Sequence, residues 1–268
     1  MRERIWLRLR KSKLFRKLYG WRMLAGPIRF VSFVLVPAAG RKRLQVRTGP
    51  GKGLVFDLNP RWDHAAWEGD YESEVQRQFV KFVKPGAIVY DIGANYGFFC
   101  LLGARTGAEV IAFEPDKENA ATLARHVDLN NLQNRVRIVS EAVFSYTGDV
   151  ALEPPAQAGV HGNARANPDS TLPTVVRVGC TTLDDFTASN PAPNLVKMDV
   201  EGNESDVLKG ADRTFRVFRP VLLCEIHDGE NAQFAQDWLK ERGYDCVWLE
   251  GEPRFPKHLL ASPRNQIV

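Results

Sequence analysis

The chain has 268 residues, of which 44% are hydrophobic and 25% are charged, and its net charge is +4. This composition is ordinary for a globular protein and excludes a disordered, collagen-like or disulfide-rich chain. The length suffices for one substantial α/β domain with appendages.

Residues 1–60 are predicted to form a basic, partly amphipathic N-terminal extension that contains a helix. Residues 1–47 hold 14 Lys and Arg but a single acid, Glu3, and several interleaved aromatic side chains. This mixture favours either a peripheral contact with an anionic membrane or packing on the domain or on a second subunit. The uncharged stretch 30–40 is too short to span a bilayer, and the basic region before it is too long for a signal peptide.

The rest of the chain has more acidic than basic residues. A nucleic-acid groove would need clustered cations there, so nucleic acid is not an expected partner. The four cysteines are scattered and form no CxxC pair, which favours a reducing, cytoplasmic location and argues against zinc. The oligomeric state stays open, and a homo-oligomer is compatible with the sequence.

Apolar runs of strand length alternate with helical stretches, which predicts a doubly wound, mainly parallel α/β sheet. The predicted strands are residues 87–92, 109–113, 136–143, 195–200, 221–226 and 246–249. The predicted helices are residues 71–83, 96–106, 117–130, 204–208 and 232–242. Residues 153–173 are predicted to be a long loop or lid. The domain is placed at residues 61–255, and residues 256–268 at a loosely held C-terminal tail.

The first candidate site is the turn at residues 89–97 (VYDIGANYG), which links an apolar strand to a helix. Gly93 and Gly97 let the backbone approach a ligand without a Cβ in the way. The spacing is not that of a dinucleotide fold, because Asn95 stands where the second glycine would be. The carboxylate of Asp91 would repel a pyrophosphate but suits an amino or sulfonium cation. A plain structural turn is the alternative.

Acidic residues also lie at or near the ends of the next two predicted strands. Glu114, directly before Pro115, can accept hydrogen bonds from both hydroxyls of a ribose. It indicates a nucleoside rather than a methyl donor in particular, since nicotinamide enzymes use an acid in the same way. Glu141 and Ala142, near the end of the third strand, are candidates for contact with an adenine ring.

A third group of acids lies in residues 195–204 (LVKMDVEGNE), where a buried strand leads into a glycine turn. Asp199 and Glu201 are expected at the carboxyl end of the sheet, where ligands bind in open α/β folds. Charged groups there cost stability unless they are paired. Lys197 is a candidate partner, which would make Asp199 structural.

Together these motifs resemble the FkbM-type methyltransferase family. The resemblance covers about residues 68–250 and also includes residues 71–72 (YE), 113–115 (FEP), 182–184 (TLD), 209–211 (KGA), 219–220 (RP) and 225–227 (EIH). It implies a seven-stranded class I methyltransferase (Rossmann-like) fold and S-adenosylmethionine as cofactor. The implied acceptor is a hydroxyl group of a sugar, glycolipid or secondary metabolite. The implied cofactor-binding residues are Glu72, Asp91, Gly93, Ala94, Asn95, Gly97, Glu114, Pro115, Glu141, Ala142 and Asp199.

Methyl transfer to an alcohol requires aligned reactants and a base for the hydroxyl proton. His227, at the end of the fifth predicted strand, is the first candidate, with Asp199 and Glu201 as its catalytic neighbours. A structural histidine explains His227 equally well, and His161 in the loop is a further candidate. Asp199, Glu225 and His227 could instead hold a divalent cation that binds the acceptor oxygen.

Two other functions stay open on sequence grounds. A nicotinamide-dependent oxidoreductase shares the fold and the ribose acid but should show the three-glycine spacing, which is missing. A non-catalytic nucleoside-binding or membrane-tethered protein would keep the turn but would not need Asp199 or Glu201. A nucleic-acid methyltransferase is disfavoured, because Asp-Val-Glu-Gly stands where an Asn/Asp-Pro-Pro-Tyr-like tetrad is expected.

Overall fold

The computed structural model describes residues 40–59, 63–153, 164–251 and 254–264. Its centre is a seven-stranded sheet in the order β12-β13-β11-β10-β3-β4-β5. The strands are β3 (Ile88–Ile92), β4 (Glu109–Phe113), β5 (Val136–Val139), β10 (Leu195–Met198), β11 (Val221–Ile226), β12 (Tyr244–Trp248) and β13 (Lys257–Pro263). The pairs that β13 forms with β11 and β12 are antiparallel, and the other described pairs of this sheet are parallel. The doubly wound, mainly parallel sheet predicted from the sequence is confirmed.

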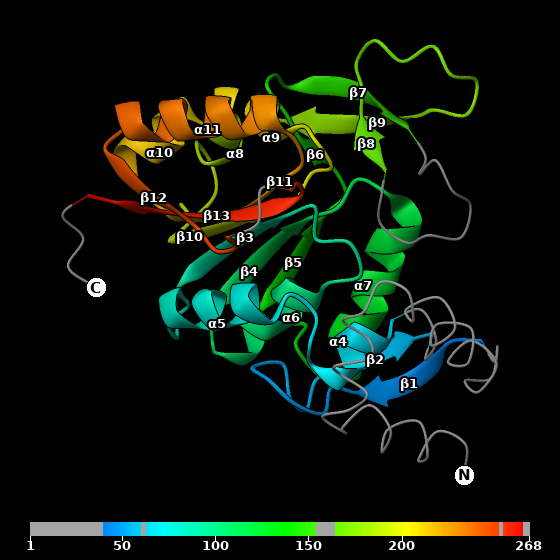
Figure 1. Cartoon of the computed structure of the whole chain (residues 1–268). Coiled ribbons are helices and arrows are strands. Elements are labelled where there is room, and N and C mark those ends of the chain that lie inside the picture. The colour runs from blue at the N-terminus through cyan, green and yellow to red at the C-terminus, as the bar shows by residue number, and fades with distance from the viewer. Residues whose placement is uncertain (1–39, 60–62, 154–163, 252–253, 265–268) are drawn as a thin grey trace, which may run out of the picture.

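Helices cover both faces of this sheet (Figure 1). One face carries α5 (Ser73–Phe82), α6 (Phe98–Arg105) and α7 (Lys117–Leu129), and the other carries α8 (Leu183–Phe186), α9 (Glu204–Lys209), α10 (Asp212–Val217) and α11 (Gly229–Glu241). Successive side chains of a strand point to opposite faces, so β3 contributes Val89 to one hydrophobic cluster and Tyr90 and Ile92 to the other. The sheet is therefore buried on both sides.

The functional edge of the sheet is set by β3 and β10, which pair at its centre. From β3 the sheet grows through β4 and β5 on one side, and from β10 it grows through β11 on the other. The strand order thus reverses between β3 and β10. In open α/β sheets the crevice outside the carboxyl ends of the strands at this point is where ligands bind.

A smaller sheet in the order β6-β9-β7-β8 stands beside the central one (Figure 1). It consists of β6 (Ala142–Val143), β7 (Gly148–Glu153), β8 (Arg165–Ala166) and β9 (Val176–Thr181), and it has its own apolar cluster. The single strand expected over residues 136–143 is in fact β5 and β6, which belong to different sheets. Part of the expected long loop forms β8, while residues 154–163, including His161, lie outside the described residues.

Residues 42–58, which sequence analysis assigns to the N-terminal extension, form an antiparallel hairpin of β1 (Lys42–Gln45) and β2 (Val55–Leu58). The hairpin packs on α7, where the Asn130 side chain bonds the backbone N–H and carbonyl of Val55 at 2.9 and 2.7 Å. The short helix α4 (His64–Glu68) follows. The helix and membrane contact expected of the arm fall largely on residues 1–39, outside the described residues. Within the described ranges, no helix has the length and apolarity to cross a membrane.

The C-terminal segment corrects an expectation. Residues 256–268 were expected to form a loosely held tail, but β13 lies between β11 and β12 in the central sheet. Leu259 and Ala261 on β13 are fully buried. The prolines and polar residues of this segment suggest a tail, whereas an antiparallel strand needs only alternate residues to be apolar.

Candidate functional site

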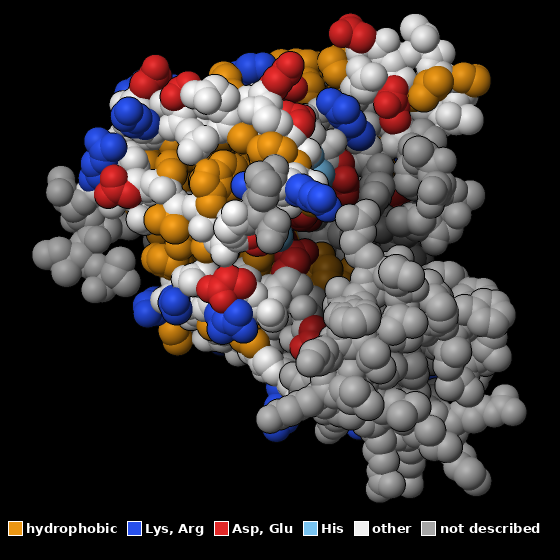
Figure 2. All heavy atoms as spheres, viewed as in Figure 1, with side chains coloured by type: hydrophobic (Ala, Val, Ile, Leu, Met, Phe, Trp, Pro, Cys, Tyr) orange, Lys and Arg blue, Asp and Glu red, His pale blue; other side chains and the backbone are white. Residues whose placement is uncertain are grey.

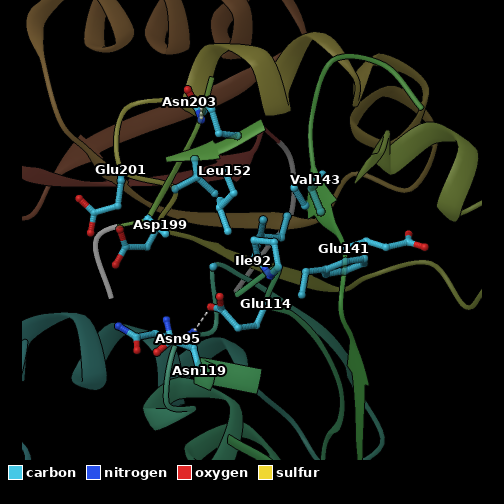
Figure 3. A pocket seen from close by; sticks show the side chains of 17 residues that line it. Ile92, Asn95, Glu114, Asn119, Glu141, Val143, Leu152, Asp199, Glu201 and Asn203 are labelled. Atoms are coloured by element: carbon cyan, nitrogen blue, oxygen red, sulfur yellow. Dashed lines mark hydrogen bonds between the residues drawn. The ribbon is translucent and has the colours of Figure 1, made fainter. Parts of the chain in front are cut away.

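A pocket opens at the carboxyl ends of β3, β4 and β10 (Figure 3). Asp199 and Glu201 lie on one side of it, and Val143 and Glu141 lie on the other. Side chains of the small sheet, including Leu152 of β7, complete its lining. The pocket therefore occupies the crevice predicted from the strand order.

The floor of the pocket is a turn that only glycine can make. Gly93 has a φ of +75°, and a Cβ on it would lie 1.8 Å from the carbonyl oxygen of Asp199. The N–H groups of Gly93 and Ala94 both donate to the carbonyl of Phe113 at 3.0 Å. The turn after β3 is thus fixed against the ends of both β4 and β10, so the backbone itself can approach a ligand.

Glu114 follows β4 and is only 5% exposed. Its Oε2 accepts the backbone N–H of Asn95 at 2.7 Å, and its Oε1 accepts that of Asp116 at 2.9 Å. Burial raises the pKa of Glu114 to about 7, although these two N–H groups favour its ionised form. Each carboxylate oxygen keeps a further lone pair for a ligand in the pocket. The Oδ1 atom of Asn95 is also buried and has no hydrogen-bond partner among the described residues.

The other predicted cofactor residues divide into two groups. Pro115, Glu141 and Ala142 line the pocket, but Figure 3 shows the carboxylate of Glu141 pointing away from the other labelled side chains. Ala94 and Gly97 shape the turn without lining the pocket. These two residues therefore determine the backbone conformation of the turn and do not contact the pocket with their side chains.

Asp91 and Glu72 also lie outside the pocket lining. Asp91 is 3% exposed and accepts the backbone N–H of Cys100 in α6, and burial raises its pKa to about 6. Although burial alone would raise the pKa of Glu72, the neighbouring His258 and Lys197 hold it below its usual value. Both carboxylates instead interact electrostatically with the buried Lys197.

Lys197, on β10, is a buried cation among these carboxylates and is 2% exposed. Its Nζ lies 3.8 Å from Oδ2 of Asp199. Burial alone would lower its pKa, but Asp199, Glu72, Glu225 and Asp91 raise it. Lys197 therefore stays charged and offsets the mutual repulsion of these carboxylates. The pairing expected between Lys197 and Asp199 is present.

His227 follows β11 and does not itself line the pocket, but it contacts three acids, of which Asp199 and Glu201 do line it. Its Nδ1 is 2.7 Å from Oε1 of Glu204, and its Nε2 is 3.4 Å from Oε2 of Glu201 and 3.7 Å from Oδ1 of Asp199. Burial alone would lower the pKa of His227, but Glu204, Asp199 and Glu201 raise it to about 9. In the view of Figure 2, acidic and histidine side chains lie in a hollow near the middle of the molecular surface.

Asp199 is itself a perturbed group. Burial raises its pKa to about 8, against the attraction of Lys197, and the neighbouring Glu225 and Glu72 raise it further. In the pair formed by Asp199 and Glu225, the pKa of Glu225 moves the opposite way, because His258 and Lys197 outweigh its burial. The first proton taken up by this pair therefore goes to Asp199.

The candidate metal ligands Asp199, Glu225 and His227 are grouped differently from the expectation. Asp199 and His227 lie with Glu201, whereas Glu225 lies with Glu72 and His258. The Nε2 atom of His258 is 3.4 Å from Glu72 and 3.7 Å from Glu225, and burial alone would lower its pKa, but these acids raise it to about 10. In each group the histidine pairs with two carboxylates, and these contacts account for the clustering without a metal.

Several pocket residues were not found from the sequence. Leu152 and Ala166 come from strands of the small sheet, which were not predicted. Asn203 follows the glycine turn, and its Nδ2 donates to the carbonyl of Ala166 at 2.7 Å, which ties β8 to the end of β10. Asn203 and Glu204 stand inside the motif at residues 197–204, and that position was the signal that could have identified them.

Comparison with known proteins places the site in a family context. Residues 91–246 match the family model of the methyltransferase FkbM domain. The hexuronic acid methyltransferase AglP of Haloferax volcanii is 28% identical over 172 residues, which is 63% of this chain and 68% of that protein. The 2-O-methyltransferase NoeI of Sinorhizobium fredii is 29% identical over 202 residues, which is 67% of this chain and 81% of that protein.

A solved structure shows the same fold. The crystal structure of the methyltransferase FkbM from Methylobacillus flagellatus KT aligns with a TM-score of 0.50 and 19% identity, covering 70% of this chain. This chain spans about half of that protein, 53% of its length. The likeness establishes the class I methyltransferase fold for the central sheet and its helices.

Proposed function

Because this chain belongs to the FkbM methyltransferase family, we propose that it transfers the methyl group of S-adenosylmethionine to a hydroxyl group of a sugar, glycolipid or secondary metabolite. The observation that carries the proposal is one pocket with buried Glu114 at its base and Asp199 and Glu201 at its acidic side. The names of AglP and NoeI, a hexuronic acid methyltransferase and a 2-O-methyltransferase, support a sugar acceptor.

The residues present fit S-adenosylmethionine. Glu114 keeps lone pairs for two ribose hydroxyls beyond its two backbone bonds. The turn at Gly93 leaves the backbone open to a ligand, and the carboxylates of Asp199 and Glu201 favour a cationic group over a pyrophosphate. When bound, S-adenosylmethionine supplies a methyl group activated by the positive charge on sulfur.

His227 is the proposed general base. Its Nε2 faces Asp199 and Glu201, which both line the pocket, so it can accept the proton of an acceptor hydroxyl there. Asp199 and Glu201 then stabilise the imidazolium that forms. Because the pKa of His227 is raised to about 9, its neutral form becomes abundant only in alkaline solution. We therefore expect turnover to increase from pH 7 to pH 9.

Methyl transfer is tested with methyl-labelled S-adenosylmethionine and a panel of neutral sugars, uronic acid glycosides and glycolipids. Label should enter a hydroxylated acceptor and survive treatment with alkali, since an O-methyl ether is stable to base whereas a methyl ester is not. Alkali-labile label would place the transfer on a carboxylate instead. Binding of the cofactor without transfer to any acceptor would favour a non-catalytic nucleoside-binding protein.

Glu114→Ala is expected to weaken S-adenosylmethionine binding at least tenfold. Hydrogen bonds to a charged group contribute about 1.5 to 3 kcal/mol, and the alanine removes the acceptor for the ribose hydroxyls. Calorimetric titration measures the change, with Glu118→Gln on the exposed side of α7 as the matched control. An unchanged affinity in a folded Glu114→Ala protein would refute the assignment of Glu114 to the ribose.

The affinity for S-adenosylmethionine is also expected to depend on pH. Glu114 must be ionised to accept both hydroxyls, and its pKa in the free protein is about 7. The dissociation constant should therefore rise by up to about tenfold per unit as the pH falls below 7. Titrations at pH 6, 7 and 8 test this, and the dependence should flatten in Glu114→Gln. A wild-type dissociation constant that does not vary over this range would contradict it.

A further inference from the structure

Glu204 is the most deeply buried acid of the site, with no exposed surface. Its Oε1 accepts the backbone N–H of Gly202 at 2.9 Å and lies 2.7 Å from Nδ1 of His227. Its Oε2 is buried without a hydrogen-bond partner among the described residues. Burying a carboxylate costs several kcal/mol unless it is well paired. Stability alone does not explain a glutamate that leaves one oxygen unsatisfied.

The contact with Glu204 determines which nitrogen of His227 can exchange a proton. An ionised carboxylate only accepts hydrogen bonds, so Nδ1 of His227 must carry the hydrogen at this contact. The nitrogen that gains and loses a proton is therefore Nε2. This atom faces Glu201 at 3.4 Å and Asp199 at 3.7 Å, and both of these residues line the pocket.

We propose that Glu204 is the positioning residue of His227, and that its carboxylate holds the imidazole so that Nε2 is presented to the acceptor hydroxyl. The inference rests on the proposed function, in which His227 accepts the hydroxyl proton. Glu204 itself does not line the pocket, so it acts on the reaction only through the histidine. The same carboxylate stabilises the imidazolium formed when the proton arrives.

Charged groups from several elements face His227. Glu204 lies on α9, and Asp199 and Glu201 lie after β10. Glu225 on β11 interacts with Asp199 and so affects the ring only indirectly. All of these groups are acids, and Glu204 has the shortest contact with the ring. Removing the charge of Glu204 should therefore make His227 less basic, while Asp199 and Glu201 keep their places.

Glu204→Gln removes the charge of Glu204 while keeping its packing. The glutamine has the same shape, and its oxygen can still accept the N–H of Gly202. The acidic limb of the pH profile of kcat is expected to move to lower pH by about one unit. Maximal turnover should fall at least tenfold, with the acceptor KM and the cofactor Kd within about twofold of wild type. Glu204→Asp, which restores the carboxylate, should return the profile toward wild type.

A matched control is available on the same helix. Asp206 is a partly exposed acid of α9 that pairs with Lys209 at the surface, so Asp206→Asn should leave the pH profile and turnover unchanged. A folded Glu204→Gln protein with wild-type turnover and pH profile would overturn the proposal and leave Glu204 a structural residue.

The contact between Glu204 and His227 can also be tested without an activity assay. Nuclear magnetic resonance titration of the His227 ring in the free protein should show a lower pKa in Glu204→Gln and a value near wild type in Glu204→Asp and Asp206→Asn. An identical His227 titration in wild type and Glu204→Gln would overturn the proposal even if no acceptor were known. Conversely, a shifted titration in a protein that binds the cofactor but methylates nothing would sustain the pair and refute the proposed function.

Discussion

Asp199→Asn is expected to lower methyl-transfer turnover by about two orders of magnitude or more at pH 9, measured at saturating S-adenosylmethionine. The substitution keeps the shape of the side chain and removes a charge 3.7 Å from Nε2 of His227. Because the pKa of Asp199 is raised to about 8, its carboxylate is ionised at pH 9 and stabilises the imidazolium. Single-turnover and steady-state rates with labelled cofactor measure the effect. Asp149→Asn, an exposed acid on β7, is the matched control.

The same variant separates three roles of Asp199. If its main role is to pair with Lys197, the variant should melt early. If it binds a divalent cation, wild-type activity should fall on chelation and return with magnesium or manganese. If it acts through its contact with His227, chelation should have no effect. A variant that is stable and fully active would remove Asp199 from the mechanism.

Lys197→Met is expected to destabilise the protein by about 3 to 5 kcal/mol. The ammonium group is buried among Asp199, Glu72, Glu225 and Asp91, and methionine fills its volume without its charge. The carboxylates left behind can escape repulsion only by taking up protons. The loss of stability should therefore be largest near pH 8 and should shrink as the pH falls toward 5.

Urea unfolding of the two proteins at several pH values measures this effect. Lys209→Met removes an exposed lysine that pairs with Asp206 on α9, and it should change the free energy of unfolding by less than about 1 kcal/mol. If Lys197→Met lowered the free energy of unfolding by no more than this control, Lys197 would not be the charge that stabilises the four carboxylates around it.

The central part of the fold could be predicted because buried parallel strands are continuous apolar runs. Residues 109–113 and 221–226 are strands with the predicted ends, and β3 differs from its prediction by one residue. The family resemblance seen in the motifs is confirmed by the match over residues 91–246. Strand β13 and the small sheet were missed, because short strands are defined by partners that the local sequence does not reveal.

The candidate site, like the fold, has some residues that could be predicted from the sequence and others that could not. Gly93 and Glu114 could be found because each directly follows a predicted strand, and Asp199 because it lies near the end of one. Parallel strands bring their ends to one edge. Glu204 and His258 could not be assigned a role in this way. Their significance comes from partners distant in sequence, His227 for the first and Glu72 and Glu225 for the second.

The central claim is that the pocket takes S-adenosylmethionine, and calorimetric titration of the full chain at pH 8 tests it most directly. S-adenosylmethionine and S-adenosylhomocysteine should each bind with a dissociation constant in the low micromolar range. NAD should show no detectable binding, because its pyrophosphate would meet Asp199 and Glu201 and find no three-glycine turn. Tight binding of NAD, or no binding of either sulfur nucleoside, would contradict the account.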